Sequence, residues 1–198
     1  MNANNVLILP GWKNSGPQHW QSLWEAAHGY SRVAQHDWQR PLRGDWIARL
    51  EDVLLSRPEP SVLVAHSLGC LLVAAWAAHS RNTHLVKAAL LVAPADVGRE
   101  ELAPVLASWS PAVLRPLPFK SVLVGSRNDP YCSFERAQAF ANHWGSEFKD
   151  LIDAGHINTE SGLGAWPQGH DWLLELLELL EISADPQSDQ KITEKKPW

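Results

Sequence analysis

The segment Ala65-His66-Ser67-Leu68-Gly69 places a serine between two small residues. It follows the apolar run Val62-Leu63-Val64 and precedes residues with the spacing of an apolar helix. A sharp strand-to-helix turn brings the positions two before and two after the serine close together, so both must be small. The turn strains the serine backbone by about 1–3 kcal/mol and exposes the hydroxyl. The pattern predicts a nucleophile at Ser67; the alternative is an ordinary turn with a capping serine.

A serine hydroxyl needs a base within hydrogen-bond reach, and the base needs an acid that orients it. Asp129 follows one predicted strand and His156 follows the next one along the chain. Because the carboxyl ends of parallel strands meet at one edge of a sheet, we expect both side chains beside Ser67. The order serine, acid, histidine is the order that such α/β enzymes use. The sequence therefore predicts Asp129 as the acid and His156 as the base.

Each of these assignments has an alternative in the sequence. Asp129 could only cap the helix that starts near Ser133, and Asp96 also follows a strand, which makes it the main rival acid. Asp153 ranks third because it is too close to His156 in sequence to reach the ring easily. His66 is expected to pack under the turn rather than to act as the base.

The other predicted site residues bind rather than react. An oxyanion needs two N–H donors, and we expect them from the backbones of Leu68 and Trp12. Gly11 allows the loop before Trp12 an unusual backbone angle, although the same loop could be only a tight turn. His19 could border a substrate pocket. The loop residue Trp166 lines the pocket or plugs the rim of the core, and these two interpretations stay open.

Strand-like and helical patterns alternate along the chain, which predicts an α/β fold with a mainly parallel six-stranded sheet and helices on both faces. The predicted strands are Asn5–Leu9, Arg32–His36, Ser61–Ala65, Lys87–Val92, Ser121–Val124 and Glu147–Ile152. The predicted helices are Pro17–Ala27, Asp45–Ser56, Leu68–His79, Ser133–Trp144 and Ala165–Ile182. The proline-rich segment Ala93–Pro118 is either a small cap over the site or a short helix with extended flanks.

Length and composition fit one domain over residues 1–182, followed by a polar tail over residues 183–198. The net charge of −5 and a pI near 6.0 argue against nucleic acid or an anionic membrane as partner. The sequence has no signal peptide or membrane span, so we expect a cytoplasmic protein. Its two cysteines, Cys70 and Cys132, are expected to be free thiols. Phosphate-loop, zinc-binding and dinucleotide-binding motifs are absent, so no cofactor or metal is expected.

Four stretches give the chain a resemblance to a known family: Leu9-Pro10-Gly11-Trp12, Ala65 to Cys70, Asn128-Asp129-Pro130-Tyr131 and Gly155-His156-Ile157-Asn158. The chain resembles the small serine hydrolases of the retinoblastoma-binding protein nine type, within the α/β-hydrolase superfamily. The resemblance implies the strand order 2-1-3-4-5-6, with Ser67 as nucleophile, Asp129 as acid and His156 as base.

The expected activity is hydrolysis of small carboxylic esters or amides, with a small acyl compound as the binding partner. The resemblance leaves the substrate open, because the first member of that type was named for binding a protein. The alternative is therefore a protein-interaction module on a hydrolase scaffold, with a protein partner and weak or vestigial catalysis.

Overall fold

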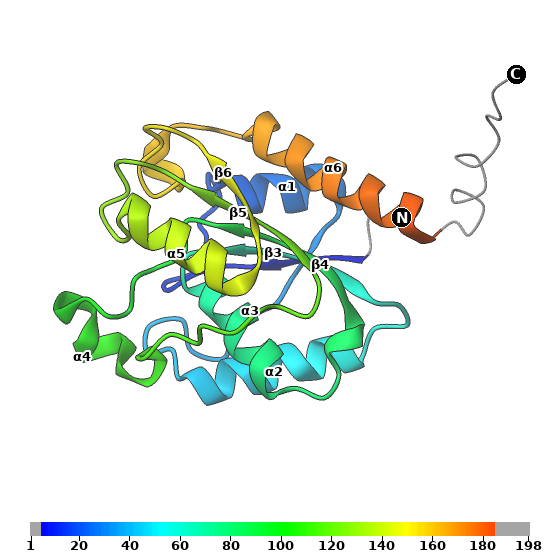
Figure 1. Cartoon of the computed structure of the whole chain (residues 1–198), viewed down its shortest axis with the longest axis horizontal. Coiled ribbons are helices and arrows are strands. Elements are labelled where there is room, and N and C mark those ends of the chain that lie inside the picture. Colours follow the sequence, from blue (N-terminus) through cyan, green and yellow to red (C-terminus); the bar gives the residue numbers. More distant parts are fainter. Residues whose placement is uncertain (1–4, 185–198) are drawn as a thin grey trace, which may run out of the picture. The chain divides into compact units, whose positions relative to one another are not determined.

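All six strands join one parallel sheet in the computed structural model, which describes residues 5–184 (Figure 1). The strands are β1 (Val6–Leu9), β2 (Ser31–Arg32), β3 (Ser61–His66), β4 (Val86–Val92), β5 (Lys120–Gly125) and β6 (Glu147–Asp150). They lie in the order β2-β1-β3-β4-β5-β6, and every neighbouring pair is parallel. The predicted fold class and strand order are confirmed. Parallel pairing brings the carboxyl ends of the central strands to one edge.

Among the described residues, an α-helix follows each of the six strands along the chain, and all of these helices but the last lie between two strands. They are α1 (Trp20–His28), α2 (Arg43–Leu55), α3 (Leu68–His79), α4 (Ala103–Leu106), α5 (Phe134–Trp144) and α6 (Pro167–Ala184). Local sequence sets several of the ends. The Ser133 hydroxyl accepts a hydrogen bond from Arg136 N at the start of α5, and Gly29 and Gly145 end α1 and α5 with φ of 71°.

The two faces of the sheet carry different helices. Residues of α2, α3 and α5 share one core cluster with the strands, whereas α1 packs its buried Trp20 and Trp24 on the opposite face (Figure 1). Helix α3 lies at the centre of the first layer, and all its residues from Leu68 to Trp76 are buried. A helix that is apolar on all sides must be enclosed, so the residue that leads into it, Ser67, has a rigid support.

Two compact units make up the described chain. The first extends to Ala165 and contains the sheet and helices α1 to α5. The second contains Trp166 and α6, where the Trp166 ring lies so close to Gly169 that a Cβ there would meet it at 2.3 Å. A single domain over residues 1–182 stays a prediction. Of the predicted tail, residues 185–198 lie outside the described residues.

Two predicted boundaries were wrong. The second strand is Ser31–Arg32 rather than Arg32–His36, because only this short stretch aligns with β1, and the pairing ends where Val33 N donates to Ile8 O. The first helix starts at Trp20 rather than Pro17, because the His19 ring accepts a hydrogen bond from Gln21 N and caps the helix there. The other boundaries agree within two residues.

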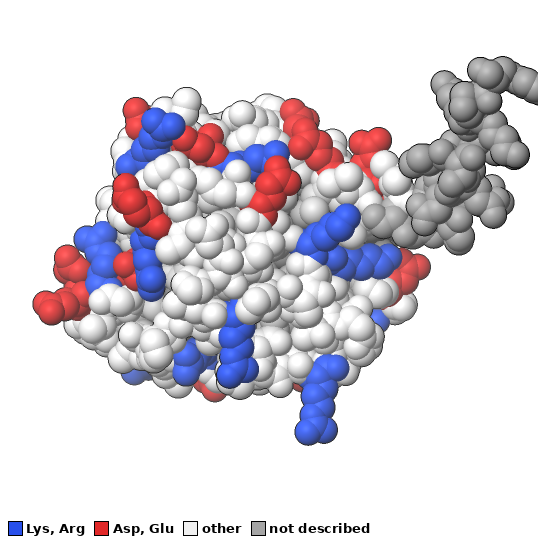
Figure 2. Space-filling model, viewed as in Figure 1, with Lys and Arg blue, Asp and Glu red and all other residues white. Residues whose placement is uncertain are grey.

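On the face seen in Figure 2, acidic side chains lie among lysine and arginine side chains in the upper part, whereas the lower part shows mainly lysine and arginine. Among residues 5–184, none of the helices is long and apolar enough to cross a membrane.

Candidate active site

Ser67 stands at a sharp turn between β3 and α3. Its backbone has φ of 54° and ψ of −119°, a region that residues other than glycine rarely adopt. A Cβ on Gly69 would lie 2.3 Å from Leu9 O, so a larger residue would collide with the backbone of β1. The requirement for a small residue at this position thus comes from the neighbouring strand. The turn holds the Ser67 hydroxyl at the edge of the sheet where we expected it.

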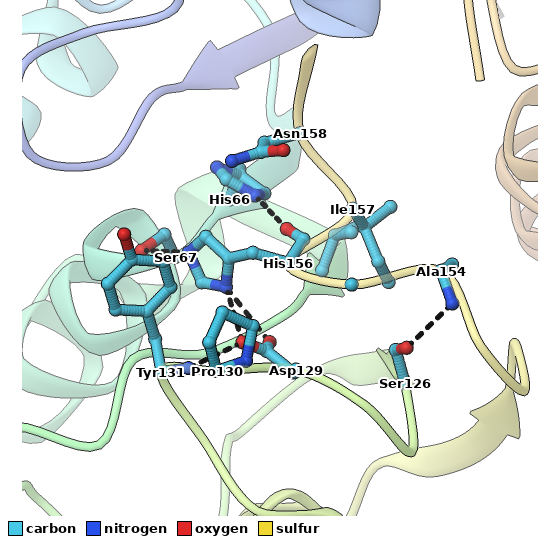
Figure 3. A network of polar contacts seen from close by, with 12 residues as sticks. His66, Ser67, Ser126, Asp129, Pro130, Tyr131, Ala154, His156, Ile157 and Asn158 are labelled. Atoms are coloured by element: carbon cyan, nitrogen blue, oxygen red, sulfur yellow. Dashed lines mark hydrogen bonds and ion pairs between the residues drawn. The ribbon is translucent and has the colours of Figure 1, made fainter. Parts of the chain in front are cut away.

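Ser67, His156 and Asp129 form a hydrogen-bonded line (Figure 3). His156 Nε2 lies 2.9 Å from Ser67 Oγ, and His156 Nδ1 lies 2.9 and 3.0 Å from the two Asp129 oxygens. Because a carboxylate accepts, Nδ1 carries the proton and Nε2 faces the hydroxyl as an acceptor. The Asp129 side chain is 3% exposed, so water does not compete for it. This arrangement can take a proton from the serine hydroxyl.

The loops that carry Asp129 and His156 are hydrogen-bonded to each other beside this line. Asn128 Oδ1 accepts a hydrogen bond from Gly155 N at 2.6 Å, so the residues that precede Asp129 and His156 are joined. Ser126 Oγ accepts a second bond from Ala154 N at 2.9 Å (Figure 3). These ties fix the spacing of the acid and the base.

Tyr131 contacts both Asp129 and His156. Its backbone N–H donates to Asp129 Oδ1 at 2.8 Å, and its ring centroid lies 4.6 Å from that of His156 (Figure 3). In the sequence, Asn128 and Tyr131 stand out only as parts of a motif. Their positions one residue before and two residues after Asp129 are the signal that could have indicated these roles.

Two further histidines lie beside His156. His66 Nε2 donates to the main-chain oxygen of His156 at 2.9 Å, and its ring centroid lies 4.8 Å from that of His19. Burial lowers the pKa of His19 from 6.5 to about 4, with Arg32 and His156 adding to the effect. Burial also holds the pKa of His66 well below its ordinary value. Both rings are therefore neutral at pH 7. The His66 ring bonds to the main chain of His156, whereas Ser67 Oγ is bonded to the His156 ring.

The backbone N–H groups of Trp12 and Leu68 have no acceptor within the described part of the chain. Gly11 lets their loops approach, since a Cβ there would lie 2.8 Å from Ser67 Cβ and 3.3 Å from Leu68 N. These two N–H groups beside Ser67 are therefore free to bind an oxyanion, which needs two such donors.

A cavity of about 300 Å³ opens over Ser67. It is lined by the predicted residues Gly11, Trp12, His19, Leu68 and His156. Trp166 is not in the lining; it belongs to the unit that contains α6, where its ring packs beside Trp172. The segment Ala93–Pro118 contributes Ala95, Leu102 and Leu106 to the lining, so it forms a wall of the cavity.

The rival residues have other partners. Asp96 accepts hydrogen bonds from Arg136 Nε and Gly98 N, and Asp153 is exposed. Cys70 points into the core, where its thiol donates toward Val92 O at 3.4 Å, and burial raises its pKa. Within residues 5–184, no group of three or more His, Cys, Asp or Glu side chains is arranged to hold a metal ion.

The model of a family described as serine hydrolase matches residues 6–175. The chain belongs to the serine hydrolase family. No curated protein matches this serine hydrolase.

One solved structure supports the assignment, and two others share the fold. The hydrolase is 32% identical to a putative YdeN-like hydrolase from Pectobacterium atrosepticum, over 89% of this chain and 91% of that one, with a TM-score of 0.79. It shares its fold with the ydeN gene product of B. subtilis, at 20% identity over 88% and 99% of the two chains and a TM-score of 0.68. It also shares its fold with Est1E from Butyrivibrio proteoclasticus, solved with ferulic acid, at 13% identity over 87% and 89% and a TM-score of 0.65.

Proposed function

We propose that this hydrolase cleaves small carboxylic esters or amides through an acyl-enzyme on Ser67. Membership of the serine hydrolase family supports hydrolysis as the reaction. The observation that carries the proposal is the hydrogen-bonded line from Ser67 through His156 to Asp129, with distances of 2.9 to 3.0 Å. In this proposal the three residues are a catalytic triad.

The mechanism follows from the proton positions. His156 Nε2 takes the Ser67 proton as the oxygen attacks the acyl carbon, and Asp129 stabilises the imidazolium that forms. His156 then gives this proton to the leaving oxygen or nitrogen, whose bond to the acyl carbon breaks. A water molecule repeats the sequence on the ester of Ser67, releases the acid and restores the serine hydroxyl.

The oxyanion of each tetrahedral intermediate is bound by the N–H groups of Trp12 and Leu68. Both lie in the cavity lining, and neither has a competing acceptor among the described residues. A donor of this kind contributes about 3–4 kcal/mol to the transition state. Gly11 serves the same step indirectly, because it lets the loop of Trp12 approach Ser67.

Within the family we propose that the chain is of the retinoblastoma-binding protein nine type, which its motifs at Pro10-Gly11-Trp12 and Asn128-Asp129-Pro130 support. We also propose a cytoplasmic location, where the two buried thiols of Cys70 and Cys132 stay reduced.

A fluorophosphonate probe tests the assignment directly. The probe should label the wild-type protein on Ser67, and the variant Ser67→Ala should lose both the label and ester turnover. Ser110→Ala is the matched control, because Ser110 is exposed and outside the cavity lining, and it should label normally. Equal labelling of Ser67→Ala and the wild type would remove Ser67 from the mechanism. Capture of a protein partner without turnover of any acyl compound would favour the interaction module instead.

A further inference from the structure

Four residues with apolar side chains are among the lining of the cavity, namely Leu68, Ala95, Leu102 and Leu106. Leu68, Ala95 and Leu106 are buried, and Leu102 is half-buried against the core. None of these side chains carries a polar atom, so they can stabilise a bound ligand only by burying its hydrocarbon surface. We call these four residues the apolar wall.

The apolar wall is fixed in place by hydrogen bonds on both sides of its leucines. On one side Asp96 N donates to Tyr131 O at 3.2 Å, and the Arg99 guanidinium donates to Pro130 O. On the other side Trp109 Nε1 donates to Pro41 O at 2.9 Å. Leu102 and Leu106 are therefore held over the cavity before a ligand arrives, and binding does not have to order them.

A different wall follows His156 in the chain. Asn158, Thr159 and Glu160 line this part of the cavity. The Asn158 Oδ1 atom accepts a hydrogen bond from Glu160 N at 3.0 Å, which assigns the amide orientation and makes Nδ2 the donor end of the amide. Nδ2 donates to none of the described residues, so an oxygen atom of a ligand can take this hydrogen bond.

The chemistry of the proposed reaction assigns one part of the substrate to each wall. The leaving group must receive its proton from His156 Nε2, so it departs on the side of His156 and of the residues that follow it. The acyl carbon is bonded to Ser67 Oγ, and its oxygen lies against the N–H of Leu68, whose side chain belongs to the apolar wall. We assign the acyl chain to Leu102 and Leu106, because these residues supply apolar lining to the cavity.

We propose that the substrates are esters that join a short apolar acid to an alcohol carrying a further acceptor oxygen. The acid is held by the apolar wall and the alcohol by Asn158 Nδ2. This inference rests on the proposed function and adds the substrate class to it. Each methylene that the apolar wall buries should raise kcat/KM about four-fold until the cavity of about 300 Å³ is filled.

The acid is tested with p-nitrophenyl acetate, propionate, butyrate and methoxyacetate, in which methoxyacetate has the shape of butyrate with one ether oxygen. Each kcat/KM is divided by the rate of the same ester with hydroxide, which removes differences in intrinsic reactivity. We expect butyrate, with two more methylenes, to exceed acetate about sixteen-fold and to exceed methoxyacetate. Leu106→Ala should reduce the ratio of butyrate to acetate at least three-fold, and Leu106→Met should keep it.

Leu114→Ala is the control for the leucine variants, since Leu114 belongs to the same segment but lies outside the cavity lining. It should leave the ratio unchanged. Each ratio is taken within one protein preparation, so a variant that folds incompletely still gives a valid value.

The alcohol is tested with the butyrate esters of n-butanol and 2-methoxyethanol, which have the same shape. We expect the methoxyethyl ester to be preferred about five-fold by the wild type. Asn158→Asp keeps the acceptor for Glu160 N but loses the amide donor, so this preference should disappear. Unchanged preference in this variant would exclude Asn158 from recognition and overturn this half of the inference.

The result that overturns the inference as a whole is a flat acid series combined with rates that rise with the length of the alcohol. The leucines would then hold the alcohol. If no ester is turned over and Ser67 is not labelled by the fluorophosphonate, the proposed function fails and the inference falls with it. Labelling and turnover with flat ratios leave the proposed function standing and overturn only the substrate class.

Discussion

The His66 side chain donates a hydrogen bond to the main-chain oxygen of His156, with 2.9 Å between Nε2 and O (Figure 3). His66 is the residue before Ser67, and His156 is the residue whose ring faces Ser67. The bond therefore joins the two loops that carry the proposed nucleophile and base. Because both partners are buried, breaking it leaves a carbonyl oxygen without a donor.

We expect His66→Phe to lower kcat about ten-fold with little change in KM. The His156 carbonyl loses its donor at a cost of about 1–3 kcal/mol, and His156 is then less well held in position beside Ser67. Steady-state kinetics on one ester measures this. His66→Gln supplies an amide donor and should recover part of kcat, and His84→Phe, at an exposed histidine, is the control. A change confined to KM would place His66 in ligand binding instead.

Substitution of Asp129 and of Asp96 should show which of these two carboxylates orients His156. Asp129→Asn loses the charge that stabilises the imidazolium and favours the wrong ring tautomer, so kcat should fall on the order of 10⁴-fold. Asp96→Asn alters only a contact with Arg136 and a bond from Gly98 N, so kcat should change little. The assignment is wrong if the larger loss is found in Asp96→Asn.

Gly69→Ala should be severely destabilising, because the new Cβ would lie 2.3 Å from Leu9 O and 3.1 Å from Pro10 O. Both contacts are with backbone, so β1 and α3 would have to separate, at a cost of about 3 kcal/mol. Urea unfolding measures the loss. Gly16→Ala is the control, because no atom lies within 4 Å of its Cβ position. Similar stability of the two variants would contradict the close approach of the turn to β1.

The free energy of unfolding should fall as the pH falls from about 6.5 to 4. In this range the unfolded chain binds a proton at His19, whose folded-state pKa is lowered to about 4, so protonation favours unfolding. His66 acts with the same sign. His19 alone accounts for about 3 kcal/mol.

Urea unfolding at several pH values tests this effect. His19→Asn keeps a side chain that can cap α1 and should flatten the dependence. An unchanged slope in this variant would exclude His19 as a source of acid sensitivity.

Much of the fold could be predicted because its central strands are buried on both faces. The runs at β3 and β4 have little polar alternation, and α3, whose buried residues extend from Leu68 to Trp76, was predicted to the residue. The edge strand β2 could not be located in this way. Its two residues are half-buried, and their pairing depends on where β1 ends rather than on local preference.

The candidate site was predictable where chemistry fixes the residue types. Ser67, Asp129 and His156 follow three different strands, and the topology brings them into contact. The contribution of Leu102 and Leu106 to the cavity lining was not predictable residue by residue, because their segment is held there by long-range bonds such as that of Trp109 to Pro41. Trp166 was chosen for its residue type and its loop, which do not determine where its ring packs.

The left-handed backbone of Ser67 comes from the join of β3 to α3, and the hydroxyl itself contributes nothing to it. Any short side chain at this position will therefore stand in the same spot and face the same imidazole. A cysteine there would form a thioester in place of the ester that we propose for the serine, and an alanine would leave a cavity that binds substrate without cleaving it. The architecture of the turn thus makes the reacting atom exchangeable without rebuilding its surroundings.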